Sequence, residues 1–162
     1  MRLKKRSLFI LLPLLWALFI SLAQADEDLQ KPIDHFYHWA NATYGQNHTA
    51  SITPEALKAN LSAIFAPDIV HYLNGKKVAA SVPDLYARFL KLDHKYRSVD
   101  VLLPYDDIVI DPIQHKVAIQ YRIRFILPDG HEKLLHAQTI FAVRQGKITQ
   151  FNEISAFEGD HL

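Results

Sequence analysis

The sequence predicts an α+β domain in which three N-terminal helices pack on a strongly curved, mainly antiparallel sheet and leave a cone-shaped pocket. Apolar residues recur at helical spacing through much of residues 28–97, whereas residues 98–157 alternate between apolar and polar as strands do. The four expected long strands follow one another through tight turns, which makes them antiparallel neighbours. A twisted sheet wrapped over helices is concave, and helices that cover this face in part leave a pocket beneath it.

The first two helices are expected over residues 28–45 and 53–68. In the first, apolar residues recur at helical spacing up to Gly45, which is a helix-stop signal. In the second, Thr53 is a good N-cap and Pro67 should end the helix. The apolar stripe of the second helix consists of Leu57, Leu61, Ile64 and Phe65.

A short hairpin is expected over residues 68–81, because Asn74-Gly75 is a strong signal for a two-residue turn between strands. A third helix should follow over residues 81–97, with Ser81 as its N-terminal signal. Its apolar stripe consists of Leu85, Phe89 and Leu92.

The remaining chain predicts four long strands, at residues 98–111, 116–128, 132–144 and 147–157. The first is interrupted at Pro104, and turns with Gly130 and Gly146 link the last three. One face of the second long strand is apolar and consists of Val117, Ile119, Tyr121, Ile123 and Phe125.

The last strand breaks the alternation, since Ile148 and Phe151 are three residues apart and a regular strand would point them to opposite faces. Either a β-bulge or burial of both faces would explain this spacing. The polar Asn152 and Glu153 that follow would then lie where the strand lines a cavity.

Residues 1–25 have the three parts of a secretory signal peptide in order. Residues 1–6 are basic, residues 8–22 are largely apolar, and the Ala-Gln-Ala of 23–25 fits a signal-peptidase site. The apolar run is shorter than the ~20 residues that usually span a bilayer. We therefore expect cleavage and one domain over residues 26–162; the alternative is an uncleaved membrane anchor.

Composition narrows the class of protein. The chain has 18 Lys+Arg against 17 Asp+Glu, and four of the basic residues belong to the signal, so the domain itself is slightly acidic and no nucleic-acid partner is expected. Without cysteine, thiol chemistry and disulfides are excluded, and export points to the periplasm of a Gram-negative bacterium or to secretion. No cofactor is expected, and the helical pair His35 and His38 lacks a third metal ligand, so no metal is expected either.

The chain resembles the nuclear transport factor 2-like superfamily, and within it the SnoaL-like and ketosteroid-isomerase-like domains, over essentially all of residues 26–162. The resemblance rests on the order of elements and on three segments: "IFAPDIVHYLNG" from Ile64, "VPDLYARFL" from Val82 and "IFAVRQGKITQFNEIS" from Ile140. It implies a cone-shaped pocket on the concave face of the sheet and a homodimer through the convex face. No membrane contact is expected once the signal is cleaved.

The resemblance also implies positions for isomerase chemistry, which uses a carboxylate base with a tyrosine and a second acid. Tyr37 matches the tyrosine. The base is expected near His71 and the second acid near Gln138, but neither position has a carboxylate. Catalytic candidates are therefore His71, as a general base near neutral pH, and Tyr37.

The ligand-binding candidates combine these two residues with polar side chains of the expected strands: Tyr37, His71, Tyr121, His136, Gln138, Asn152 and Glu153. The sequence leaves open which face of the sheet lines the pocket. It supports three hypotheses: a binder of a small hydrophobic ligand or a partner protein, an isomerase-, cyclase- or hydratase-type enzyme that uses a pocket histidine, and a membrane-anchored component of an envelope assembly.

Overall fold

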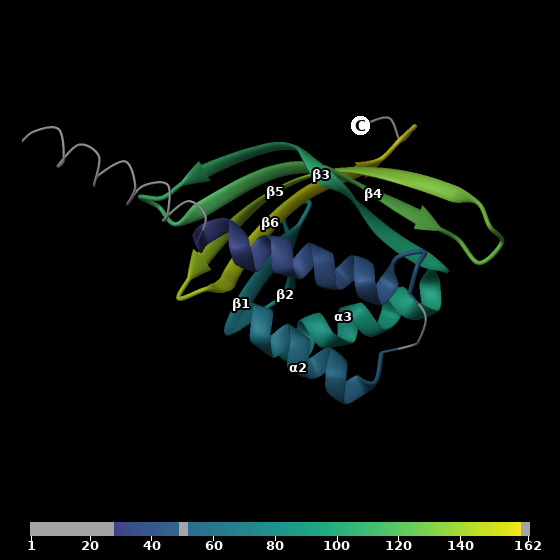
Figure 1. Ribbon diagram of the computed structural model, residues 1–162, viewed down its shortest axis with the longest axis horizontal. Helices are drawn as coiled ribbons and strands as arrows, with labels where there is room; N and C mark the ends of the chain where they lie inside the picture. Colours follow the sequence, from purple (N-terminus) through teal and green to yellow (C-terminus); the bar gives the residue numbers. More distant parts are fainter. Residues whose placement is uncertain (1–27, 49–51, 160–162) are drawn as a thin grey trace, which may run out of the picture.

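The computed structural model describes residues 28–48 and 52–159; the predicted signal peptide lies outside this part. Three helices lie together on the concave side of one curved sheet (Figure 1). The first is helical over residues 28–44, and α2 (Pro54–Ile64) and α3 (Val82–Lys95) follow. None of the helices in the described part is long and apolar enough to cross a membrane.

The sheet has six strands: β1 (Phe65–Leu73), β2 (Lys76–Ala79), β3 (Ser98–Asp111), β4 (Lys116–Ile126), β5 (Glu132–Arg144) and β6 (Lys147–Phe157). Their order is β2-β1-β6-β5-β4-β3. The pair β1–β6 is parallel and all other pairs are antiparallel. The predicted α+β class with a mainly antiparallel sheet is confirmed.

The predicted end of the second helix is wrong. The helix stops at Ile64, and Phe65 has extended backbone (φ −106°, ψ 148°) and begins β1. Phe65 pairs with Ile148 of β6 and is fully buried, so tertiary pairing overrides a helical pattern that fitted equally well. Pro67 lies in the irregular stretch of this pairing. Proline is tolerated there because the sheet needs no backbone N–H donor at that position.

A β-bulge accounts for the unusual spacing in β6. Phe151 pairs with Phe141 and Ile148 with Val143, so Thr149 is one residue more than β5 supplies. The bulge turns Ile148 and Phe151 to the same face, where they are 0% and 4% exposed. The bulge explanation is confirmed, and burial of both faces is not needed.

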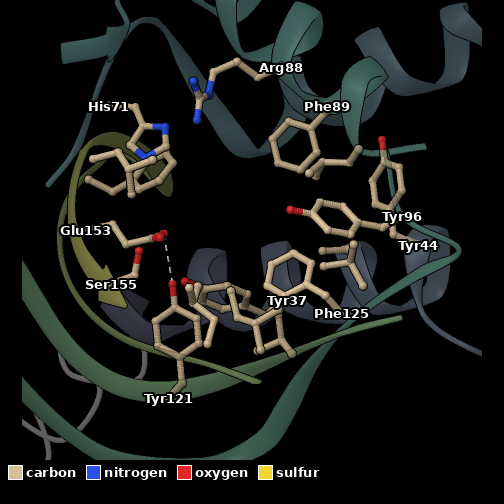
Figure 2. A pocket seen from close by; sticks show the side chains of 18 of the residues that line it. Tyr37, Tyr44, His71, Arg88, Phe89, Tyr96, Tyr121, Phe125, Glu153 and Ser155 are labelled. Atoms are coloured by element: carbon tan, nitrogen blue, oxygen red, sulfur yellow. Dashed lines mark hydrogen bonds between the residues drawn. The ribbon is translucent and has the colours of Figure 1, made fainter. Parts of the chain in front are cut away.

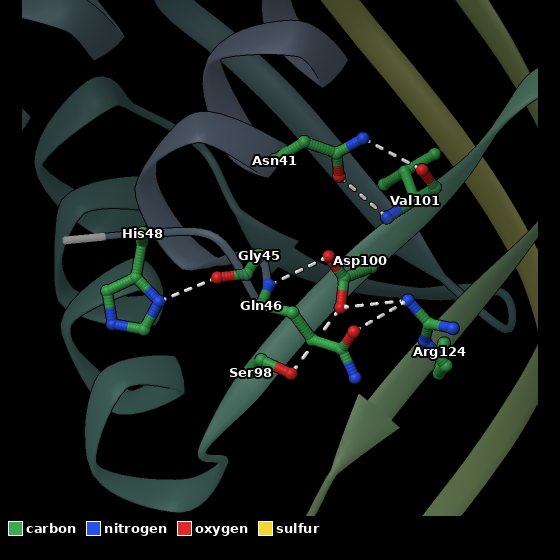
Figure 3. A network of polar contacts seen from close by, with 8 residues as sticks. All are labelled: Asn41, Gly45, Gln46, His48, Ser98, Asp100, Val101 and Arg124. Atoms are coloured by element: carbon green, nitrogen blue, oxygen red, sulfur yellow. Dashed lines mark hydrogen bonds and ion pairs between the residues drawn. The ribbon is translucent and has the colours of Figure 1, made fainter.

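The N-terminal helix is fixed to the far edge of the sheet by a side chain that imitates strand pairing (Figure 3). The Asn41 amide donates to the carbonyl of Val101 at 2.8 Å and accepts from its N–H at 2.7 Å. Directly after the helix, Asp100 accepts from the N–H of Gln46 at 2.9 Å. Gly45 allows this close approach, because a Cβ there would collide with Oδ1 of Asp100 as well as with the carbonyl oxygen of Asn41. These contacts hold the helix across the concave face, where it forms one wall of a cavity.

Candidate functional site

A cavity of about 730 Å³ lies between the N-terminal helix, α3 and the concave face of the sheet. Figure 2 shows that its side chains converge from all three of these walls. Most of the lining is aromatic or aliphatic, and it includes Phe36, Tyr44, Phe89, Tyr96 and Phe125. A cavity of this size and character is typical of sites for small organic molecules.

Polar groups gather at one end of this cavity. Glu153 and Ser155 come from β6, Tyr121 from β4, His71 from β1 and Arg88 from α3 (Figure 2). These five residues are called the polar end below. They are positioned by elements that are far apart in the sequence but neighbours in the fold.

Glu153 and Tyr121 form a hydrogen-bonded pair. The Tyr121 hydroxyl donates to Oε2 of Glu153 at 3.3 Å and lies 3.1 Å from the hydroxyl of Thr139. Burial raises the pKa of the Glu153 carboxyl above its ordinary value, although Ser155, Tyr121 and Arg88 act against that rise. Burial, and then the Glu153 charge, raise the pKa of Tyr121 well above its ordinary value, so the phenol keeps its proton. The pair can therefore hold and exchange a proton inside an apolar cavity.

His71 is buried at 7% exposure, and its ring stacks on Phe151 with centroids 3.7 Å apart. Neither ring nitrogen has a hydrogen-bond partner among the described residues. Burial, and to a smaller extent the Arg88 charge, lower the pKa of His71 from 6.5 to about 3. The imidazole is thus neutral at physiological pH and has both nitrogens available to a bound molecule.

Four of the predicted ligand-binding residues line the cavity: Tyr37, His71, Tyr121 and Glu153. Both catalytic candidates are among them. Tyr37 is buried, and the centroid of its ring lies 5.0 Å from that of Tyr121. Burial raises the pKa of the Tyr37 phenol well above its ordinary value. The structure places these side chains together, and their roles in binding or catalysis remain predictions.

The other three predicted residues do not line the cavity. His136 and Gln138 are exposed on the opposite face of the sheet, where Gln138 donates to Gln120 at 3.5 Å. Asn152 shares that face and accepts from Gln150 at 3.2 Å. The expectation failed because the concave face is the apolar face of β5, and polar residues of an alternating strand then point outward.

Arg88 and Ser155 are lining residues that sequence reasoning missed. Arg88 had a recognisable signal, because it lies between Leu85 and Leu92 on the apolar stripe of α3. An arginine on the stripe that faces the core needs a reason to be there. Ser155 was hidden by the bulge, which shifts the alternation of β6 and turns Phe151, Glu153 and Ser155 to one face.

The helical histidines His35 and His38 are both exposed. Within the described part of the chain, no three His, Asp or Glu side chains lie close enough to hold a metal ion. Among the described residues, the two histidines therefore gain no third ligand.

Comparison with known proteins identifies the fold. No protein-family model and no curated protein matches the chain. Solved structures do match: a putative SnoaL-like polyketide cyclase from Jannaschia sp. CCS1 has TM-score 0.60 at 10% identity, with 80% of this chain and 86% of that chain covered. A putative polyketide cyclase from Xanthomonas campestris pv. campestris has TM-score 0.60 at 18% identity and coverages of 80% and 91%.

An LEH-like epoxide hydrolase from M. tuberculosis also matches, with TM-score 0.58, 13% identity and coverages of 81% and 84%. Other similar structures are described as NTF2-like or as having a ketosteroid isomerase-like fold. The chain has the nuclear transport factor 2-like α+β cone fold. At these identities the likeness establishes the fold, and function must be argued from the cavity.

Proposed function

We propose that the protein binds a small, largely apolar molecule in the cavity between α3, the N-terminal helix and the sheet. The observation that carries the proposal is the cavity of about 730 Å³, whose walls are mainly aromatic and aliphatic. Five residues with polar groups form its polar end, and such groups in an apolar site can orient a ligand by one functional group. The apolar walls supply affinity through burial of ligand surface.

Binding is tested with N-phenyl-1-naphthylamine, a neutral apolar dye that fluoresces when it leaves water. We expect saturable binding by the wild type and a loss of about 10-fold or more in affinity in Ala40→Trp. Ala40 lines the cavity, and an indole there would fill ligand space. Ala42→Trp is the matched control, because Ala42 is exposed on the same helix and should leave binding unchanged. Equal binding by both variants would contradict the proposal.

We also propose that the protein is exported and forms a homodimer through the convex face of the sheet. Export is supported by the pattern of residues 1–25, and dimerisation by apolar residues on that face: Val109, Ile140 and Ile154 are 61%, 48% and 69% exposed. Native mass spectrometry of protein from the periplasm reports the mature mass, the oligomer and any retained molecule together. A retained N-terminal segment would instead support the membrane-anchored envelope component.

A proton-transfer enzyme is the second candidate, and the partly buried Glu153–Tyr121 pair favours it. Glu153 is a better base than His71, because burial raises the pKa of the carboxyl and lowers that of the imidazole to about 3. Hydration of a lipophilic epoxide is a reaction that this pair could perform. Water would give a proton to Glu153 and bond to a ring carbon as that C–O bond breaks. The ring oxygen would take the proton of Tyr121, and Glu153 would return a proton across the 3.3 Å hydrogen bond.

Hydrolysis of styrene oxide and limonene oxide tests this candidate. We expect diol formation by the wild type and a fall of about 10²-fold or more in kcat/KM in Glu153→Gln, which removes the base. Glu158→Gln is the control, because Glu158 is exposed just after the same strand. Absence of diol with the wild type would leave the protein as a binder.

A further inference from the structure

The charged side chains that line the cavity are mostly basic, and a purely apolar ligand would make no use of them. Arg88, Lys91 and Lys95 lie on one face of α3 and all line it. Among the described residues of the lining, Glu153 is the one acidic side chain. With His71 neutral, the lining therefore carries more positive than negative charge, which raises the local concentration of anions.

Arg88 is the basic residue best placed to contact a ligand. In Figure 2 its guanidinium reaches from α3 into the cavity beside His71, while the Glu153 carboxyl is turned toward Tyr121. Arg88 is half-buried, and no hydrogen bond or ion pair engages its side chain in the described part of the chain. A guanidinium withdrawn from water without a partner is costly, and an oxyanion in the cavity would offset that cost with paired hydrogen bonds.

We propose that the ligand is an amphipathic anion, whose oxyanion head lies between Arg88 and His71 and whose apolar body lies along the aromatic walls. This inference rests on the proposed binding function and names its ligand class. The head accepts from the guanidinium of Arg88 and from one N–H of the neutral His71 ring, which otherwise has no partner among the described residues. Lys91 and Lys95, both exposed, add attraction at the same helix face.

Two dyes with one scaffold separate charge from apolar contact: 1-anilinonaphthalene-8-sulfonate and its neutral parent, N-phenyl-1-naphthylamine. We expect the wild type to bind the sulfonate about 10-fold more tightly than the parent. Arg88→Gln should remove most of this preference, measured as the ratio of the two affinities in that variant. Arg144→Gln is the matched control, since Arg144 is exposed at the end of β5 and does not line the cavity.

The double variant Lys91→Gln/Lys95→Gln keeps the test decisive if Arg88→Gln does not fold, because both lysines are exposed. We expect it to weaken binding of the sulfonate about 2- to 3-fold relative to binding of the parent. Equal affinities for the two dyes in the wild type, with the parent still bound, would overturn this inference and leave the proposed function intact. If neither dye binds, the proposed function fails and the inference fails with it.

Discussion

Replacing Phe151 with alanine is expected to lower the free energy of unfolding by about 3–5 kcal/mol. The ring is 4% exposed and lies at the centre of the aromatic core. Its centroid is 3.7 Å from that of His71, 5.7 Å from Phe141 and 6.0 Å from Phe65. Alanine would remove these contacts and join the vacated space to the existing cavity, which Phe151 lines. Urea denaturation monitored by circular dichroism measures the change.

Two further variants show whether the loss comes from the ring's position. Phe151→Leu keeps most of the volume and should cost less than about 1.5 kcal/mol. Phe157→Ala removes a ring from the end of the same strand, where it is only half-buried, and should cost clearly less than Phe151→Ala. If Phe151→Ala lay within 1 kcal/mol of the wild type, the ring would not be packed as described (~1 kcal/mol is the average effect of a mutation).

The sequence predicted the strands well because local chemistry marks their ends. The hairpin between β5 and β6 turns at Gln145 and Gly146, which have φ of 51° and 70°, and the glycine takes this left-handed conformation without cost. The end of α2 could not be read in the same way. Residues 65–68 fit a helical stripe, and they are extended because Phe65 pairs with β6, more than 80 residues later in the chain.

The candidate site was predicted in part, and the residues wrongly assigned to it share one cause. The alternation of residues along a strand separates its two faces, but it does not show which face lies on the concave side of the sheet. His136 and Gln138 were grouped as a polar pocket lining, but the pocket is built on the apolar face with Leu135 and Ala137. Tyr121 and Glu153 are in the cavity because each lies on a largely apolar inner face. A polar residue on an apolar face is thus the better signal for a cavity than a group of polar residues.

Acidification is expected to destabilise the protein through His71. Burial lowers the pKa of this residue to about 3 in the folded state, against 6.5 for a freely solvated histidine. Between these two values the unfolded chain binds a proton that the folded chain refuses, so stability falls as the pH falls. The stability that depends on a neutral His71 is fully present above pH 6.5 and is lost progressively as the pH falls toward 3. At 1.36 kcal/mol per pKa unit, the expected loss is about 2 kcal/mol at pH 5 and approaches 4–5 kcal/mol near pH 3.

Other charged groups face His71, so the measurement needs a difference between variants. Arg88 opposes a second positive charge, and the raised pKa of Glu153 acts in the other direction by favouring the folded state as that carboxyl is protonated. We therefore compare the change in unfolding free energy between pH 7.5 and pH 5 in the wild type and in His71→Gln. The wild type should lose about 2 kcal/mol more.

His136→Gln is the control for this comparison, because His136 is exposed on the outer face of the sheet and its removal should leave the wild-type pH dependence unchanged. If His71→Gln lost as much stability as the wild type between pH 7.5 and pH 5, His71 would be accessible to protons in the folded protein. The cavity would then admit water at its polar end. Water could hydrogen-bond to the His71 ring, so its N–H would no longer be unpartnered before the ligand binds. A steeper loss in the wild type than in His71→Gln would show that the folded protein keeps the imidazole neutral, as its proposed role of N–H donor beside Arg88 requires.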